Sequence, residues 1–164
     1  MQGHLMGPHS LLRQIYRTVL LVISMAASVP CAMAAAVTED VWLMDAKVAV
    51  KIFPCGDRLC GRIVWLVVPR DPQGNLNRDK NNPDILLRQR RLCGLTILWG
   101  LKSTAPNRWE GGRLYNPFDG ETYNFSAKLK SGNKIVARIY RGLPLLGKTK
   151  TLQRVAHGTL EGWC

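Results

Sequence analysis

The positions of the three histidines limit the catalytic chemistry that is open to this sequence. His4 and His9 precede a segment that we expect to be removed, and His157 lies in the tail AHGTLEGWC, which we expect to be frayed. Ser–His, Cys–His and multi-histidine metal sites all need an imidazole inside the folded domain. We therefore predict a protein that is not an enzyme, with no catalytic residues, no metal site and no cofactor.

Four cysteines follow the segment that we expect to be removed. Cys55 and Cys60 flank a four-residue hairpin tip, where facing residues have Cα atoms about 4.5–5.5 Å apart, a separation that a disulfide accepts. We predict a Cys55–Cys60 disulfide rather than half a zinc site, because no second pair of ligands accompanies it. Cys93 lies in an apolar setting and is expected to be a buried thiol. Cys164 could pair with Cys93 or with another molecule.

Two groups of oxygen-bearing side chains invite a sharper interpretation. Glu110 and Glu121 could form the carboxylate pair of a glycoside hydrolase if a hairpin brought them together, but two exposed acids are the commoner arrangement. An oxygen-rich loop resembles a loose calcium site but lacks the glycine and glutamate of an EF-hand at the right offsets. A solvated, turn-rich loop is the better interpretation of Asp71, Asn75, Asn77, Asp79 and Asn81.

Aromatic and basic side chains supply the candidate ligand site. A small barrel is either filled by its side chains or holds one small ligand. The predicted cavity wall consists of Trp65, Trp99, Trp109, Tyr115 and Tyr123. Arg88 or Arg91 at the mouth could pair with an acidic head group, although cations at a helix end also suit the helix dipole.

The first 34 residues read as a cleavable secretory signal. Arg13 and Arg17 precede an apolar run of 11 residues, Val19 to Val29, which is too short to span a bilayer. Ala32-Met33-Ala34 then provides a small-x-small cleavage site. Cleavage after Ala34 lowers the formal charge from +12 to +10. We expect an exported, periplasmic protein of a Gram-negative cell that could contact an anionic membrane surface or cell wall but does not bind nucleic acid.

The elements that must position these side chains are short strands, each with a period near two and bounded by turn residues. The sequence predicts an all-β domain over residues 35–155, a closed antiparallel barrel of about eight strands, with a sandwich as the alternative. One short helix is expected near residues 83–90, with Ile85, Leu86 and Leu87 partly buried, and a tail over 156–164. The strands are expected at 41–44, 47–53, 60–68, 94–101, 109–115, 121–130, 134–141 and 148–155.

Several motifs resemble a family of small exported bacterial proteins known as domain of unknown function 2147. The matching residues run from about Val41 to Val155 and include Leu59-Cys60-Gly61-Arg62-Ile63-Val64-Trp65-Leu66, Asn82-Pro83-Asp84, Gly94-Leu95-Thr96-Ile97-Leu98-Trp99-Gly100, Trp109-Glu110-Gly111-Gly112-Arg113-Leu114-Tyr115-Asn116-Pro117 and Leu146-Gly147-Lys148-Thr149-Lys150-Thr151. The resemblance implies a lipocalin-like (calycin) barrel in the periplasm that holds a small apolar ligand.

The chain departs from that family pattern at three positions. Asp40 stands where the resemblance implies glycine two residues before Trp42, Cys93 replaces an aliphatic residue, and Leu152 replaces a tryptophan. If Trp42 plugs the barrel base, loss of the glycine affects its close packing. Loss of the tryptophan would enlarge or reshape the interior.

Residues and resemblance together lead to one functional expectation. We expect a barrel that binds a small apolar or amphipathic ligand. The alternatives are an envelope interaction module with a filled interior and a hydrolase that uses Glu110 and Glu121. The sequence does not indicate the oligomeric state.

Overall fold

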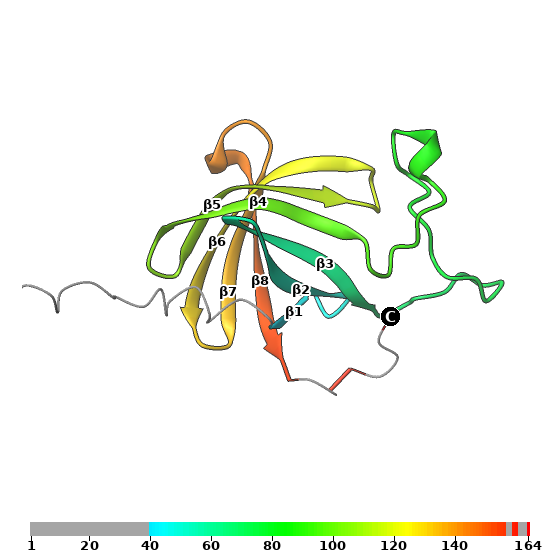
Figure 1. The fold of residues 1–164 in the computed structure, drawn as a ribbon, viewed down its shortest axis with the longest axis horizontal. Coiled ribbons are helices and arrows are strands. Elements are labelled where there is room, and N and C mark those ends of the chain that lie inside the picture. Colours follow the sequence, from blue (N-terminus) through cyan, green and yellow to red (C-terminus); the bar gives the residue numbers. More distant parts are fainter. Residues whose placement is uncertain (1–39, 157–158, 161–163) are drawn as a thin grey trace, which may run out of the picture. The chain divides into compact units, whose positions relative to one another are not determined.

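Eight antiparallel strands form one sheet that closes on itself. The computed structural model describes residues 40–156, 159–160 and 164. Each strand pairs with the next, and β8 returns to pair with β1, so the predicted closed barrel is confirmed and the sandwich is excluded (Figure 1). The strands are β1 (Val41–Met44), β2 (Val48–Cys55), β3 (Arg58–Leu66), β4 (Thr96–Ala105), β5 (Arg108–Asn116), β6 (Glu121–Ser131), β7 (Lys134–Tyr140) and β8 (Lys148–Val155).

The two-residue period of the strands builds the core. Successive side chains of a strand point to opposite faces, so one face of each strand enters the barrel. On β2 the inward residues are Val48, Val50 and Ile52, and on β6 Phe125 and Ala127 are buried in the same apolar cluster. These are the faces that the alternation predicts.

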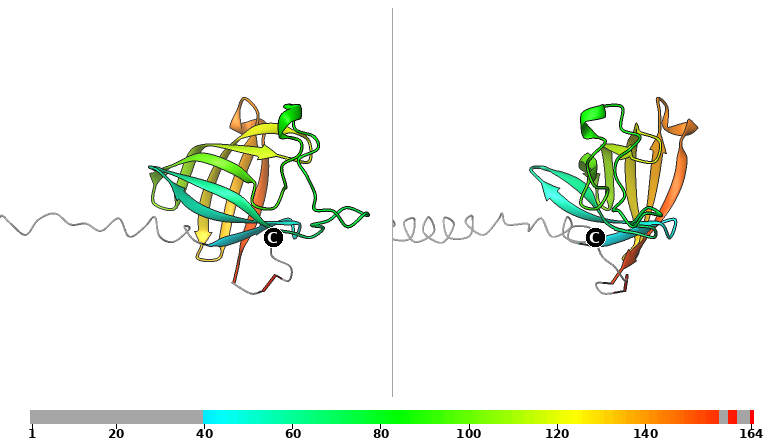
Figure 2. Two further views of the ribbon diagram at one scale, coloured as in Figure 1. Left: turned by 45° about the vertical axis from the view of Figure 1, so that its right-hand side comes forward. Right: turned by 90° about the vertical axis from the view of Figure 1, so that its right-hand side faces the viewer.

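The two ends of the barrel differ in their connections. At the end that we call the base, two-residue turns join β2 to β3, β4 to β5 and β6 to β7. At the other end, the mouth, β3 and β4 are joined by the long connection 67–95, and β7 and β8 by the loop 141–147. The turn of β1 and β2 and the turn of β5 and β6 complete the mouth. The long connection projects beside the strands in Figure 1 and in the left view of Figure 2.

The short strand β1 closes the barrel around a buried tryptophan. Trp42 is fully buried and pairs with Val50 on one side and Arg154 on the other. The Arg154 guanidinium lies 5.2 Å from the centroid of the Trp42 ring, and its Nη2 lies 3.1 Å from the carboxylate of Asp40. Asp40 therefore forms an ion pair where the family resemblance implies glycine, and Trp42 keeps its close packing.

The helix expected at residues 83–90 is a single 3-10 turn, η2 (Ile85–Leu87). Asp84 is the N-cap of this turn, and its carboxylate accepts a hydrogen bond from the Leu86 amide. Ile85 and Leu86 are exposed rather than partly buried. The segment has no second apolar turn to bury against the barrel, so packing does not extend it into a helix. A second 3-10 turn, η3 (Pro144–Leu146), lies in the β7–β8 loop.

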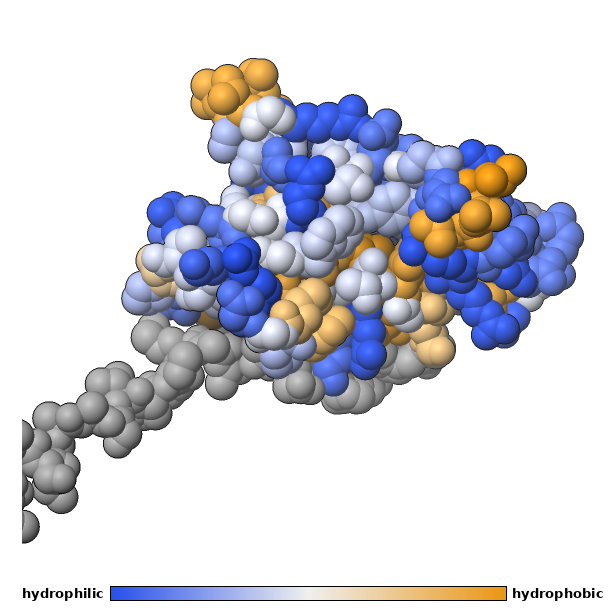
Figure 3. All heavy atoms as spheres, turned by 45° about the horizontal axis from the view of Figure 1, so that its top comes forward, coloured by the Kyte–Doolittle hydropathy of each residue, from blue (hydrophilic) through white to orange (hydrophobic). Residues whose placement is uncertain are grey.

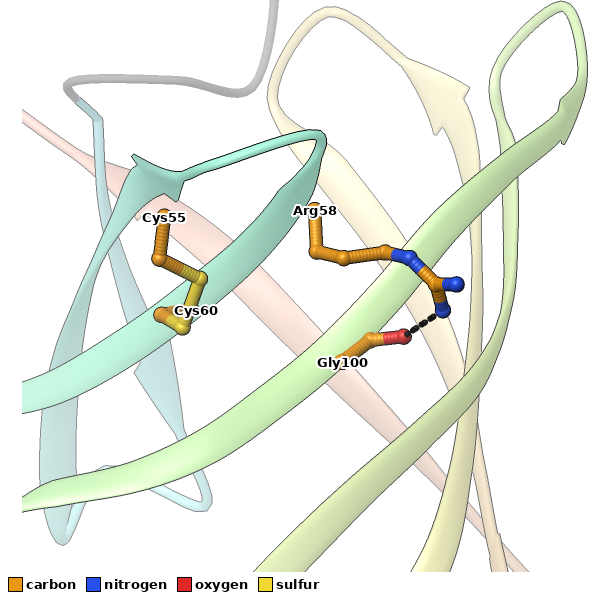
Figure 4. The surroundings of a disulfide bond; sticks show 4 residues. All are labelled: Cys55, Arg58, Cys60 and Gly100. Atoms are coloured by element: carbon orange, nitrogen blue, oxygen red, sulfur yellow. Dashed lines mark hydrogen bonds between the residues drawn. A yellow bond between two sulfur atoms is a disulfide. The ribbon is translucent and has the colours of Figure 1, made fainter.

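Two disulfides cross-link the described part of the chain. The predicted Cys55–Cys60 bond is present, with Cα atoms 5.8 Å apart (Figure 4). Its hairpin is tighter than expected: Cys55 faces Arg58 and Cys60 faces Phe53, so the two cysteines are diagonal neighbours. Cys93 is not a free thiol, because it is bonded to Cys164.

Candidate functional site

A cavity of about 630 Å³ opens at the mouth of the barrel. This volume lies in the usual range of small-molecule sites. Its deep wall is aliphatic, because Val48, Ile63, Ile97 and Leu114 point inward from four different strands. Its rim comes from the β1–β2 turn, the β5–β6 turn and the β7–β8 loop. The other lining residues are Met44, Asp45, Lys47, Tyr115, Asn116, Pro117, Phe118, Asp119, Tyr123, Ile139, Tyr140, Arg141, Leu146, Gly147, Lys148 and Lys150.

Below this cavity the interior is packed. A void of about 40 Å³ lies there, and it is lined entirely by apolar residues such as Leu101, Trp109 and Phe125. Met44, Ile97 and Leu114 line both spaces, so the void lies directly beneath the cavity. The barrel is therefore filled at its base and open at its mouth.

The rim of the cavity carries more positive than negative charge. Its acidic residues are Asp45 and Asp119, and its basic residues are Lys47, Arg141, Lys148 and Lys150. Lys150 pairs with Asp45 at 2.6 Å, and Arg141 pairs with Glu121 just outside the rim at 2.5 Å. Within the described part of the chain, Lys47 and Lys148 have no ion-pair partner. These two ammonium groups are the cations available to a bound anion.

Tyr123 joins the aromatic and charged parts of the rim. Its hydroxyl donates to Asp119 at 2.9 Å, and the Arg141 guanidinium lies 5.0 Å from its ring centroid. The hydrogen bond to the Asp119 carboxylate, followed by burial, raises the pKa of Tyr123. Asp119 also accepts from Asn116, so its charge is already engaged within the turn.

A buried carboxylate attaches the long β3–β4 connection to the barrel wall beside the cavity. Asp79 is fully buried and accepts hydrogen bonds from the Tyr115 hydroxyl at 2.5 Å, Asn82 at 2.8 Å and Arg90 at 2.7 Å. Burial, together with this bond to Asp79, raises the pKa of Tyr115 to about 12. The sequence predicts a solvated loop at Asp79, and this is wrong: the carboxylate is fully buried and paired with Arg90, eleven residues further along the chain.

The same connection rests on the β5–β6 turn through a close backbone approach. Gly120 has a φ of 77°, and a Cβ atom built on it would lie 2.0 Å from the Asn81 carbonyl oxygen. The Asn81 side-chain amide donates to the Phe118 carbonyl at 2.9 Å. Glycine is therefore required at position 120 both for its backbone conformation and for the space it leaves.

The structure brings some of the predicted site residues together and separates others. Tyr115 and Tyr123 line the mouth cavity, and Trp109 lines the packed void below it. Trp65 and Trp99 line neither space; Trp99 lies on the outer face with 38% of its surface exposed. Trp65 on β3 and Trp99 on β4 point away from the barrel interior. The aromatic residue types alone do not show whether a side chain points inward or outward.

The two arginines expected at the mouth lie outside it. Arg88 is exposed, and its Nε donates to the Asn82 carbonyl at 2.7 Å. Arg91 is exposed next to the bridge between the backbones of Arg78 and Arg91. Lys47 and Lys148 occupy the position that sequence reasoning gave to these arginines.

Glu110 and Glu121 do not form a dyad. Asn116 faces Glu121 across the β5–β6 turn, so Glu110 lies six residues away along β5. At a rise of about 3.3 Å per residue this separation is about 20 Å, beyond the range of glycosidase carboxylates. Each acid instead pairs with a neighbouring arginine, Glu110 with Arg108 and Glu121 with Arg141.

Two further searches cover only the residues that the structure describes. No group of three or more His, Cys, Asp or Glu side chains there is arranged to hold a metal ion. No helix there has the length and hydropathy needed to span a bilayer. The predicted secretory signal, residues 1–34, lies outside the described residues.

The closed eight-stranded barrel with a cavity at one end defines a lipocalin-like fold. A similar solved structure is described as "Protein HP1028 from the human pathogen Helicobacter pylori belongs to the lipocalin family"; it is 24% identical, with a TM-score of 0.63 over 74% of this chain and 84% of that one. Residues 37–154 match the family described as "Uncharacterized protein conserved in bacteria (DUF2147)", and the chain belongs to that family. No curated protein matches the sequence.

Proposed function

We propose that this protein is exported to the periplasm and binds a small amphipathic ligand in the barrel mouth. The apolar part of the ligand lies against the aliphatic wall, and an acidic head group lies at the rim beside Lys47 and Lys148. The observation that carries the proposal is the 630 Å³ cavity, aliphatic at depth and cationic at the rim. An anionic amphiphile matches both parts of this surface.

Binding rather than catalysis is supported by what the cavity presents. Its lining acids, Asp45 and Asp119, are engaged by Lys150 and by the β5–β6 turn. The alternative of an envelope module with a filled barrel requires an interior with no space larger than a water molecule. The volume of the mouth cavity argues against that alternative.

Export is supported by two independent features. The signal-like segment 1–34 predicts translocation. The two disulfides suit an oxidising compartment, since such bonds are rare in reducing cytosol. Fractionation of cells that express the full chain, with N-terminal sequencing of the recovered protein, tests this part. A cytoplasmic protein that retains residues 1–34 would refute it.

Ligand binding is tested by titrating the folded protein with three probes that share one alkyl chain: dodecanoate, dodecanol and dodecyltrimethylammonium, each below its micelle concentration. Tryptophan fluorescence or calorimetry reports binding. We expect dodecanoate to bind most tightly and the cationic probe most weakly. No binding of any probe, or preference for the cation, would overturn the proposal.

Three variants locate the site. Met44→Trp fills the junction of the two internal spaces and should abolish binding of both dodecanoate and dodecanol. Lys148→Gln should weaken dodecanoate by about tenfold and leave dodecanol nearly unchanged, because one charge-assisted contact contributes about 1.4 kcal/mol. Lys130→Gln is the matched control, because Lys130 is exposed near the base of the barrel.

A further inference from the structure

Three leucines at the mouth are exposed and lie outside the core. Leu143, Leu145 and Leu146 are 66%, 85% and 79% exposed, and only Leu146 also lines the cavity rim. We call residues 143–146 the leucine turn; it includes η3. Isolated exposed leucines are common, but a contiguous group of them marks an interaction site.

The leucine turn is held in a fixed shape by polar groups from the neighbouring strands. The Arg138 guanidinium donates to the Pro144 carbonyl at 2.8 Å and to the Leu145 carbonyl at 2.7 Å. A third hydrogen bond, 2.8 Å long, ties Arg138 to Thr149 on β8. Gly147 lies so close to β7 that an added Cβ would be 2.6 Å from the Ile139 carbonyl oxygen. The backbone is therefore anchored while the leucine side chains face outward.

A second apolar tip lies at the same height of the molecule. Ile85 and Leu86 in η2 are 70% and 83% exposed. In Figures 1 and 2 the molecule is turned about its vertical axis, which preserves height, and η2 and the leucine turn both reach the top in every view. Figure 3 shows two hydrophobic groups that project on this face, over the β7–β8 loop and over η2, among hydrophilic side chains. One flat surface could touch both tips.

Positive charge accompanies both tips. Arg141 and Lys148 flank the leucine turn in sequence, and Arg88 follows η2 directly. All three side chains are exposed. Arg141 is paired with Glu121, and the Asp84 carboxylate before η2 accepts a hydrogen bond from the Leu86 amide, so Lys148 and Arg88 are the cations that face outward without an ion-pair partner among the described residues. Small apolar projections between cations match the interface of an anionic bilayer, where leucine enters the headgroup region and lysine or arginine meets lipid phosphate. A partner protein would instead need a continuous apolar core within its footprint.

We propose that the leucine turn and η2 together dock this protein, mouth first, on an anionic phospholipid surface. Leu143, Leu145 and Leu86 insert into the headgroup region, and Lys148 and Arg88 contact lipid phosphates. Docking of this kind does not require that the cavity hold a ligand.

Flotation with phospholipid vesicles tests the docking. The folded protein should float with vesicles of phosphatidylcholine plus phosphatidylglycerol, bind phosphatidylcholine alone much more weakly, and be released as salt screens the charges. The double variant Leu143→Ser/Leu145→Ser should bind the anionic vesicles about tenfold or more weakly, because burial of each leucine contributes a substantial factor. Val68→Ser likewise replaces an exposed apolar side chain by serine, at a 62%-exposed position at the start of the long connection, and this variant should bind like the unaltered protein.

The outcomes separate docking from ligand binding and from self-association. Neither Leu143 nor Leu145 lines the cavity, so the double variant should keep its dodecanoate affinity and its urea midpoint. Equal flotation of the double variant, or flotation that is independent of phosphatidylglycerol and salt, would overturn the proposal. A dimer in sedimentation that the double variant dissociates, with no vesicle binding, would assign the leucine turn to a second copy of this chain instead.

Discussion

Asp79 is a carboxylate with three donors in a place where water is excluded. A buried charge is costly unless it is paired and hydrogen-bonded, and here Arg90 supplies the opposite charge while Tyr115 and Asn82 supply donors. The four side chains come from the long connection and from β5. These hydrogen bonds hold the long connection against β5, beside the cavity.

Replacement of Tyr115 by Phe should destabilise the protein by roughly 1–3 kcal/mol near neutral pH, because Asp79 loses one buried donor. The loss should shrink at high pH. The pKa of Tyr115 is raised from 10.0 to about 12, so the folded chain holds this proton where the unfolded chain has released it. The stabilisation is fully present below pH 10 and is lost as the pH rises through about 12.

Urea unfolding of the unaltered protein and of Tyr115→Phe across this pH range measures the effect. Lysines titrate in both proteins and cancel in the difference. Tyr123→Phe is the control, because its hydroxyl bonds an exposed carboxylate and its loss should cost less than about 1 kcal/mol. A difference between Tyr115→Phe and the unaltered protein that stays constant between about pH 9 and pH 12 would contradict the assignment.

At the scale of the elements, the β5–β6 turn packs closely against the long connection where Gly120 meets the Asn81 backbone. Gly120→Ala should destabilise the protein by about 3 kcal/mol or more, because the new methyl group overlaps the Asn81 carbonyl and the backbone is left-handed there. Gly74→Ala is the matched control: its φ is 83° with open space around it, so only the backbone cost of about 1–2 kcal/mol applies. Urea midpoints measure both, and equal losses would refute the crowding at Gly120.

The strands could be predicted from the sequence. The short helix predicted near residues 83–90 is wrong, because the structure has a single 3-10 turn there. Alternation on β2 and β6 reflects burial of one face, which is a local property of each strand. Asn82-Pro83-Asp84 carries a helix start signal, yet Asn82 is instead buried against Asp79 and Tyr115. That use depends on a residue 33 positions away, which no local pattern encodes.

At the scale of the molecule, the two disulfides close loops of very different size. The bond between Cys55 and Cys60 joins residues 5 apart, and that between Cys93 and Cys164 joins residues 71 apart. In the chain-entropy model these constraints contribute about 2 and about 4 kcal/mol respectively. Guanidinium unfolding of Cys55→Ser/Cys60→Ser and Cys93→Ser/Cys164→Ser should therefore give losses in a ratio near two. A larger loss for the short loop would show that the native-state packing around Cys55, rather than loop closure, sets the effect.

The cavity itself was the least predictable feature of the candidate site. Aromatic content predicted a lined interior, but Trp99 faces solvent and Trp109 fills the base. Whether space remains depends on the summed volume of inward residues from all eight strands and on the loops that frame the mouth. The rim cations, Lys47 and Lys148, gain their role from β1–β2 and β7–β8 connections that meet only after the barrel closes.

The packed base blocks passage through the barrel from the mouth cavity, and this has a kinetic consequence. An incoming molecule cannot push an occupant through the barrel; the occupant must leave before the next one enters. Exchange of one bound amphiphile for another should then proceed at the dissociation rate of the first, whatever the concentration of the second. For the proposed amphiphile, residence time in the barrel, rather than the rate of encounter, would govern how quickly one bound molecule replaces another.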